Sequence, residues 1–394
     1  MADARELDVV LMGATGFTGG LTADYLARHA PPDLRWGLAG RDAERLEAVR
    51  DRLAVVVDPA LSGLPLLHAD ATDPASLAGL ASRARVVVTT VGPYLLHGQA
   101  LVAACAAAGT DYVDITGEPE FVDRTYVDHH ATAQRTGARL VHSCGFDSVP
   151  YDLGAYFTVP RLPSGVPITL RSVVRVGGSV SGATFHSFVT AASRQRQARL
   201  AARDRRALEP RPEGRSSRAR SGRPHRDPLL GYWLLPLPTI DPLVVARSGR
   251  ALEAYGPDFR YSHYAGTRTL RYAATGVATV AGLGLAAQVR PLRSLLLGWV
   301  KVGEGPDEER RERAWFTVDL VGEAAGRTVH TRVSGGDPGY GETAKMLAES
   351  AMCLALDDNP AVAGQVTTAV AMGDALLARL QSAGLRFEVL SEAG

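Results

Sequence analysis

Three glycines near the start of the chain are spaced at intervals of three residues. Gly13, Gly16 and Gly19 follow an apolar run at 9–12 and lead into a periodic segment at 21–29, in the stretch DVVLMGATGFTGG. In a strand–turn–helix unit, the first glycine permits a tight turn, the second a close approach of pyrophosphate, and the third close helix packing. The helix N-terminus then presents free N–H groups to the phosphates. The stretch therefore predicts a dinucleotide site, with a purely structural glycine turn as the alternative.

The residue after the second predicted strand, at 35–40, distinguishes the two nicotinamide dinucleotides. NAD enzymes place Asp or Glu here to hold the ribose 2′-hydroxyl. This chain has Arg41, whose guanidinium can pair with a 2′-phosphate, so we predict NADP(H); a solvated arginine opening a helix is the alternative. We expect Asp70, after the third strand, to meet the adenine. The predicted cofactor-binding residues are Gly13, Thr15, Gly16, Phe17, Thr18, Gly19, Arg41, Asp70, Gly92 and Pro93.

Polar side chains at the ends of later predicted strands are candidates for proton transfer. The fourth strand, at 86–91, leads to Tyr94, and the sixth, at 138–143, leads to Asp147. Hydride transfer needs such an acid, because it leaves an anion that must be protonated. For Asp147 the alternative is a cap on the next turn. The predicted catalytic residues are Tyr94, Asp147, Tyr340 and Lys345; further candidates, with structural alternatives, are His142, Cys144, Tyr261 and His263.

Several catalytic patterns are absent from the sequence. The residues four positions before Lys301 and Lys345 are Leu297 and Gly341, which excludes the Tyr-x-x-x-Lys pair of short-chain dehydrogenases. No Cys/His cluster indicates a zinc site, so we predict no metal. No Gly-x-Ser-x-Gly elbow of a serine hydrolase is present.

Apolar strands and amphipathic segments alternate six times before residue 150. Near-continuous apolar strands separated by helices predict a parallel sheet covered on both faces, and right-handed crossovers give it the doubly wound order. We therefore predict an α/β fold with a Rossmann domain at 1–150 and a second domain of α+β type at 151–394.

The second half predicts strands at 169–178 and 182–189, a hairpin at 315–321 and 327–333, and helices at 340–356 and 360–381 that could pack back on the first domain. Residues 194–226 hold twelve arginines and three acids and predict a flexible insertion, either simply solvated or docking an acidic partner. The apolar stretch 273–289 predicts a buried or surface-lying helix; lining a substrate tunnel and resting on a membrane are the open alternatives.

Composition narrows the class of protein. With 394 residues, 46% of them hydrophobic, the chain is long enough for two globular domains, and a net charge of +1 argues against a nucleic-acid binder. Three scattered cysteines and no signal peptide-like start fit a reduced, cytoplasmic protein.

Nine motifs spread over nearly the whole chain resemble the saccharopine dehydrogenase-like oxidoreductases, most closely the actinobacterial trans-acting enoyl reductases. They are GATGFTGG, LAGR, GPY, DITGE, GFDSVPYDLG, YGPDFRYSHYA, WFTVDLVGE, SGGDPGYGETAKMLAE and GQVTTAVAMGDALLARL. The resemblance implies an NADP-binding Rossmann domain and a second domain on a mixed sheet. It also implies reduction of a carbon–carbon double bond in a lipid or polyketide chain, in trans, on a chain carried by a synthase. Residues 194–226 fit the family pattern least well.

We therefore expect an NADPH-dependent enoyl reductase whose substrate is an acyl chain, carried by an acyl carrier protein of a polyketide synthase. The alternative among enzymes is a saccharopine-type imine or ketone reductase, and outside enzymes an NADPH-binding sensor. We expect a cytoplasmic protein, and leave open a peripheral membrane contact and a homodimer.

Overall fold

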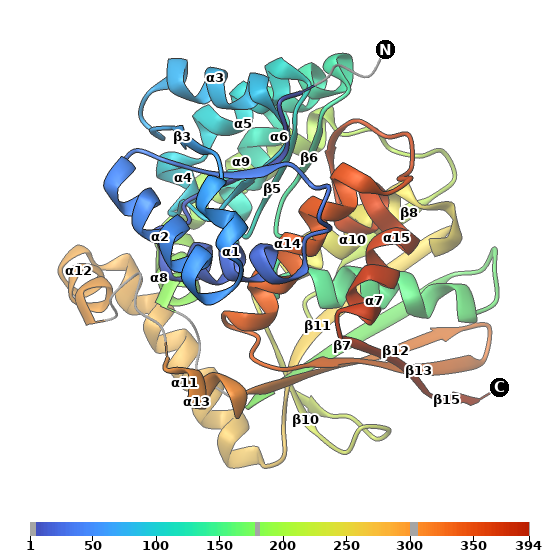
Figure 1. Cartoon of the computed structure of the whole chain (residues 1–394). Helices are drawn as coiled ribbons and strands as arrows, with labels where there is room; N and C mark the ends of the chain where they lie inside the picture. Colours follow the sequence, from blue (N-terminus) through green and yellow to red (C-terminus); the bar gives the residue numbers. More distant parts are fainter. Residues whose placement is uncertain (1–4, 178–181, 300–305, 394) are drawn as a thin grey trace.

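Seven parallel strands form the first sheet of the computed structural model, which describes residues 5–177, 182–299 and 306–393 (Figure 1). Their order is β14-β6-β5-β4-β1-β2-β3, which confirms the predicted doubly wound arrangement and adds β14 at one edge. The strands are β1 (Leu7–Met12), β2 (Trp36–Gly40), β3 (Leu66–His68), β4 (Ala84–Thr89), β5 (Asp111–Asp114), β6 (Arg139–Val141) and β14 (Gly364–Val366).

Helices cover both faces of this sheet because its strands are apolar on both sides. Every residue of β1 is buried, and alternate residues such as Val9 and Val10 belong to two separate hydrophobic cores. The helices of this part are α1 (Phe17–His29), α2 (Ala43–Val56), α3 (Pro74–Arg83), α4 (Tyr94–His97), α5 (Gln99–Ala108), α6 (Pro119–Thr136) and α9 (Gln195–Leu208).

The second sheet is mixed, as the resemblance implied. Its order is β15-β13-β12-β7-β11-β10-β9, with β8 paired to β11; β11 runs parallel to β7 and to β8, and the other pairs are antiparallel. The strands are β7 (Ile168–Gly177), β8 (Ser216–Ala219), β9 (His225–Arg226), β10 (Trp233–Pro236), β11 (Asp258–Thr267), β12 (Trp315–Ala324), β13 (Arg327–Gly335) and β15 (Arg386–Ala393). The hairpin of β12 and β13 matches the prediction.

Four helices lie between the two sheets: α7 (Val149–Thr158), α10 (Asp241–Ala251), α14 (Gly341–Leu356) and α15 (Thr368–Ser382) (Figure 1). Helix α14 buries thirteen of its sixteen residues and packs on α1, β1, β4 and β5. Inside this interface, the hydroxyl of Tyr25 donates a hydrogen bond to the carboxylate of Glu349 at 2.7 Å. The C-terminal helices thus join both parts of the molecule, and a domain boundary near residue 150 stays a prediction.

Three further helices complete the fold: α8 (Gly182–Ser193), α11 (Leu270–Gln288) and α12 (Arg290–Trp299), with the short α13 (Glu308–Glu312) beyond them. The strand predicted at 182–189 is wrong within the described residues, because this segment is helical. Phe185, Phe188, Val189 and Ala192 recur at helical spacing and pack against α11 and α12. The apolar stretch 273–289 is helical, as predicted, but the helix predicted at 360–381 begins only at Thr368, after β14.

Residues 194–226 differ from the expected flexible insertion. Helix α9 packs on α6, where Arg205 is buried in an ion pair with Asp123, and Glu209 pairs with Arg205 and Arg247. Strand β8 is hydrogen-bonded to β11, and the buried Ser217 donates to the carbonyl oxygen of Ala246 at 2.6 Å. Composition misled the prediction because two of the arginines, Arg194 and Arg205, have buried carboxylate partners, Glu120 and Asp123, far away in the sequence.

Candidate active site

The glycine turn between β1 and α1 has the geometry that a pyrophosphate site needs. Gly13 has a φ of +102°, and a Cβ at Gly19 would lie 2.0 Å from the carbonyl oxygen of Gly13, so only glycine fits at either position. On Gly16, a Cβ would meet nothing closer than 3.5 Å, which leaves space for a ligand. No side chain caps α1, and its first turn carries no acidic residue, so its first N–H groups remain available to phosphates. The predicted dinucleotide fits this turn.

The end of β2 and the end of β3 carry the two residues predicted for the adenosine side. Arg41 is exposed directly after β2, next to Asp42, whose carboxylate caps α2. The carboxylate of Asp70 accepts hydrogen bonds from the N–H and hydroxyl of Thr72, which hold its pKa below the ordinary value. Arg41 therefore presents its guanidinium to solvent near Asp70, whose pKa it also helps to lower, and Asp70 stabilises its own loop.

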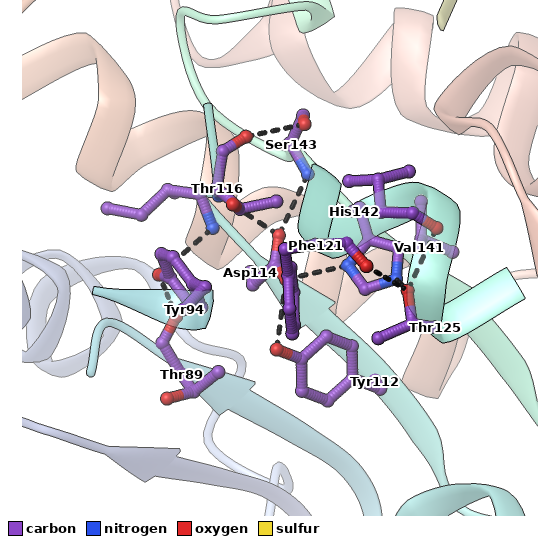
Figure 2. Close-up of polar contacts among 12 residues, drawn as sticks. Thr89, Tyr94, Tyr112, Asp114, Thr116, Phe121, Thr125, Val141, His142 and Ser143 are labelled. Atoms are coloured by element: carbon purple, nitrogen blue, oxygen red, sulfur yellow. Dashed lines mark hydrogen bonds and ion pairs between the residues drawn. The ribbon is translucent and has the colours of Figure 1, made fainter. Parts of the chain in front are cut away.

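A buried hydrogen-bond network fixes the ends of β5 and β6 (Figure 2). One carboxylate oxygen of Asp114 accepts from the hydroxyl of Tyr112 (2.9 Å) and faces Nδ1 of His142 (2.7 Å). The other accepts from the N–H groups of Thr116 (3.0 Å) and Ser143 (2.9 Å). Nε2 of His142 lies 3.1 Å from the hydroxyl of a buried threonine. These contacts make His142 the satisfied core histidine that the sequence allowed, and none of the residues of this network named here lines the cavity described below.

The same network explains the position of Tyr94. Its hydroxyl donates to the carbonyl oxygen of Thr89 at 3.1 Å and accepts from the N–H of Ile115 at 3.3 Å (Figure 2). Its own N–H and that of Leu95 donate to the carboxylate of Glu118. The ring of Tyr94 lines the cavity, but its hydroxyl proton is bound to the backbone, which gives the side chain a structural task.

The turn between β6 and α7 places Asp147. Ser143 and Ser148 have φ values of +61° and +106°, which L-residues rarely adopt, and such strain is often concentrated at functional sites. Asp114 holds the start of this turn, and the hydroxyl of Thr343 on α14 accepts from the N–H of Phe146 at 3.1 Å. Contacts from both parts of the molecule therefore hold the turn in its strained shape.

A cavity of about 570 Å³ extends from the glycine turn to the second sheet. Its lining includes Phe17 of the glycine turn, Tyr94 and Asp147 at strand ends, and Val174 and His263 of the second sheet. The carboxyl ends of parallel strands are where open α/β sheets bind their ligands. The predicted cofactor turn and the predicted acid Asp147 therefore share one cavity.

The carboxyl of Asp147 is the clearest acid in this cavity. Burial, reinforced by the nearby carboxyl of Asp241, raises the pKa of Asp147 to about 7. Burial likewise raises the pKa of Asp241 to about 6, although the hydroxyls of Thr239 and Ser148 oppose the shift. No hydrogen bond from the described residues reaches the Asp147 carboxyl, and Gly117 leaves room for it, since a Cβ there would be 3.2 Å from its Oδ2. Asp147 can thus hold a proton at neutral pH and offer it to the cavity.

Tyr151 and His263 are two further polar residues of the cavity lining. Burial raises the pKa of Tyr151 well above its ordinary value, and its hydroxyl makes no hydrogen bond among the described residues. The ring of Tyr151 packs edge-on against His263, with centroids 4.7 Å apart. Burial lowers the pKa of His263 to about 3, and its Nδ1 lies 2.9 Å from the hydroxyl of Ser172. His263 is therefore a neutral support for Tyr151 and for Asp241, whose Oδ2 lies 3.6 Å from its Nε2.

Of the other two predicted catalytic residues, Tyr340 lies at the cavity and Lys345 does not. Tyr340 lines the cavity and packs edge-on against Phe17, with centroids 4.8 Å apart. Lys345 does not line the cavity, because on α14 its Nζ is bound at 2.9 Å to the carboxylate of Glu342, three residues earlier. Among the described residues, no three His, Cys, Asp or Glu side chains come together as a metal site would need.

Sequence reasoning missed Tyr151 and Asp241. Tyr151 lies only four residues after Asp147 in the motif GFDSVPYDLG, so the motif itself was the available signal. Asp241 opens α10, ninety-four positions after Asp147 in the chain, and no local pattern distinguishes it from an ordinary helix-start aspartate.

Arg41→Ala should weaken NADPH binding by roughly 1.5–3 kcal/mol, the scale of a charge-assisted hydrogen bond, because the 2′-phosphate loses its cation. The affinity for NADH, which lacks that phosphate, should hardly change. Fluorescence titration with both cofactors measures the two effects, and Arg52→Ala on α2 serves as the control. Equal losses for NADPH and NADH would remove Arg41 from this task.

Comparison with known proteins agrees with this geometry. Residues 9–141 match the family model of the saccharopine dehydrogenase NADP binding domain. Proteins named trans-acting enoyl reductase are 39% identical in Mycobacterium bovis, with 97% of each chain covered, and 38% identical in Mycobacterium ulcerans, also with 97% of each chain covered.

A solved structure shares the fold. The apo saccharopine dehydrogenase (L-Glu forming) of Saccharomyces cerevisiae matches with a TM-score of 0.56 at 12% identity, over 98% of this chain and all of that one. The full-length relatives and the matched domain together show that the chain belongs to the saccharopine dehydrogenase-like oxidoreductases, in the group of the trans-acting enoyl reductases, and carries their NADP-binding domain.

Proposed function

We propose that this protein is an NADPH-dependent trans-acting enoyl reductase, which reduces the carbon–carbon double bond of an α,β-unsaturated acyl thioester. The observation that carries the proposal is the position of the Asp147 carboxyl in the same cavity as the glycine turn; burial there raises its pKa to about 7. The full-length likeness to proteins named trans-acting enoyl reductase supports the reaction class.

The cofactor's place follows from the residues that fit it. The N-terminus of α1 and Gly16 would hold the pyrophosphate, and Arg41 the 2′-phosphate. Gly92 and Pro93 line the cavity beside this turn, on the side where we propose the nicotinamide binds. When bound, NADPH supplies a hydride to the β-carbon of the substrate.

The protein's own residues then manage the charge and the proton. As the β-carbon gains a hydride, the electron pair of the double bond moves toward the thioester oxygen, which becomes an enolate. The hydroxyl of Tyr151, which has no other hydrogen-bond partner among the described residues, donates to this oxygen. Asp147 gives its carboxyl proton to the α-carbon, the carbonyl re-forms, and Asp147 is left as a carboxylate that water reprotonates.

The paired carboxyls make this proton available. Two buried carboxyl groups that lie close together cannot both ionise easily, so the pair retains a proton at neutral pH. Asp241 is the more enclosed of the two and accepts from the hydroxyl of Ser148 at 3.4 Å. Asp241 is therefore a positioning residue, and Asp147 faces the substrate.

The acid form of Asp147 should control the pH profile. Because its pKa is about 7, kcat should fall as pH rises above 7, and Asp147→Asn should lose this limb and lower kcat by roughly 10²–10⁴-fold. Stopped-flow absorbance of NADPH with an enoyl pantetheine thioester measures both. A variant that keeps the same pH limb would show that another group donates the proton.

Stability gives an independent control for this variant. A raised carboxyl pKa stabilises the fold fully below the unfolded value near 4, and that stabilisation is lost as pH rises through about 7. Asp147→Asn should therefore gain Tm over the wild type at pH 8 and not at pH 4.

The alternative functions predict other results. An enzyme that reduces an imine or ketone but not the enoyl thioester would favour the saccharopine-type alternative, and NADPH binding without any turnover would favour a sensor.

A carrier protein is the partner that trans action requires, and α9 offers a surface for it. Arg196, Arg199, Arg203 and Arg206 recur at intervals of three and four, so they form one exposed stripe, while Arg205 faces the core. Acyl carrier proteins are generally acidic, and such a stripe would speed their encounter by long-range attraction. This stripe replaces the flexible loop that the sequence suggested for the same task.

Arg199→Glu with Arg206→Glu should lower kcat/KM for a carrier-bound enoyl chain by roughly 10-fold at low salt, since the attraction becomes repulsion. Turnover of the neutral pantetheine thioester should stay near wild type. Arg386→Glu, an exposed arginine of β15, is the matched control. If turnover of the carrier-bound enoyl chain is unchanged, the stripe is only a solvated surface.

Cytoplasmic location and homodimer formation stay predictions.

A further inference from the structure

Helices α11 and α12 expose an unusual number of large apolar side chains. Leu285 is 72% exposed and Tyr272 73% exposed, where a single exposed leucine would need no explanation. We define the apolar face by its six members: Leu270, Tyr272, Leu285, Val289, Leu292 and Leu295. Leu285 lies near the end of α11, Val289 at the extended junction between the two helices, and Leu292 and Leu295 one turn apart on α12.

The opposite side of these helices is already packed. Ala287 of α11 and Leu296 of α12 are buried against Val189 of α8. Helix α8 in turn lines the cavity through His186 and Thr190. Helix α8 thus lies between the cavity and these two helices, and α11 and α12 lie at one side of the molecule (Figure 1).

Charge identifies the kind of surface that would cover this face. Between residues 268 and 299 the chain has no Asp or Glu, but it has Arg268, Arg271, Arg290 and Arg293. The part of the chain that the structure describes provides no carboxylate partner for these four arginines. Apolar side chains flanked by cations, with long arginine stems able to reach outward, are typical of helices that lie in the interface of an anionic membrane.

Other occupants fit less well. A second copy of this chain on the same face would bring arginines against arginines. An acidic carrier protein would complement the arginines but would have to cover six large apolar side chains, and it already has a stripe of higher charge density on α9. Crossing the bilayer is not available either, since none of the described helices is both long and apolar enough.

We propose that the apolar face of α11 and α12 docks the protein on an anionic lipid surface, without crossing it. The leucines enter the boundary between headgroups and acyl chains, and Arg290 and Arg293 pair with the lipid phosphates. This docking holds the α8 wall of the cavity next to the bilayer, where long acyl chains accumulate. It is independent of which double bond the enzyme reduces.

Vesicle co-sedimentation of the full chain tests the proposal. Wild type should bind vesicles of phosphatidylcholine with phosphatidylglycerol, bind phosphatidylcholine alone more weakly, and lose affinity as salt rises. Leu285→Asp with Leu292→Asp should lower binding by at least ~10-fold, because two exposed leucines that would enter the lipid become charged. Val55→Asp, at an 86% exposed position on α2, is the matched control and should bind like wild type.

A second variant separates the electrostatic contribution to lipid binding from the apolar one. Arg290→Ala with Arg293→Ala should lose the preference for anionic vesicles and keep weak binding to both kinds. NADPH titration confirms that each variant is folded. Equal binding by wild type and the Leu285/Leu292 variant, or no binding by wild type, would overturn the proposal. So would a wild-type dimer in light scattering that the same variant converts to monomers, since a second copy would then cover the face.

Discussion

The mechanism that we propose depends on the burial of two carboxyl groups. Burial raises the pKa of both Asp147 and Asp241, and their proximity reinforces the effect at Asp147. In water, a carboxyl titrates near pH 4 and offers almost no proton at pH 7. We propose that burial in the cavity between the two sheets converts an ordinary aspartate into an acid suited to neutral pH.

Neighbouring elements hold the turn that carries Asp147 in place. Asp114 ties the ends of β5 and β6 together and fixes the start of the strained turn, while Thr343 on the buried helix α14 holds its centre. Since α14 packs on the first sheet, cofactor turn and acid are held by one rigid element. The lipid-docking proposal adds a reason for the position of α8, which forms a cavity wall on one side and supports α11 and α12 on the other.

Local sequence patterns were enough to predict much of the fold. The glycine spacing, the six apolar strands and the hairpin of β12 and β13 are encoded within short segments, and each was predictable. Long-range contacts were not. Composition predicted a flexible insertion at 194–226, whereas Arg205 is buried in an ion pair with Asp123, far away in the sequence. Asp241 carries no local signal because Asp147 is also far away in the chain. The ion pair of Lys345 with Glu342 is different, because Glu342 lies only three residues earlier on the same helix.

Isotope tracing tests the central claim most directly, namely that the enzyme adds a hydride to the β-carbon while Asp147 protonates the α-carbon. An enoyl pantetheine thioester would be reduced once with NADPH deuterated at nicotinamide C4 in ordinary water, and once with ordinary NADPH in heavy water. The account predicts deuterium at the β-carbon in the first product and at the α-carbon in the second, with the second step slowed strongly in Asp147→Asn. Deuterium at any other position, or an α-proton delivered as fast by the variant as by the wild type, would contradict it.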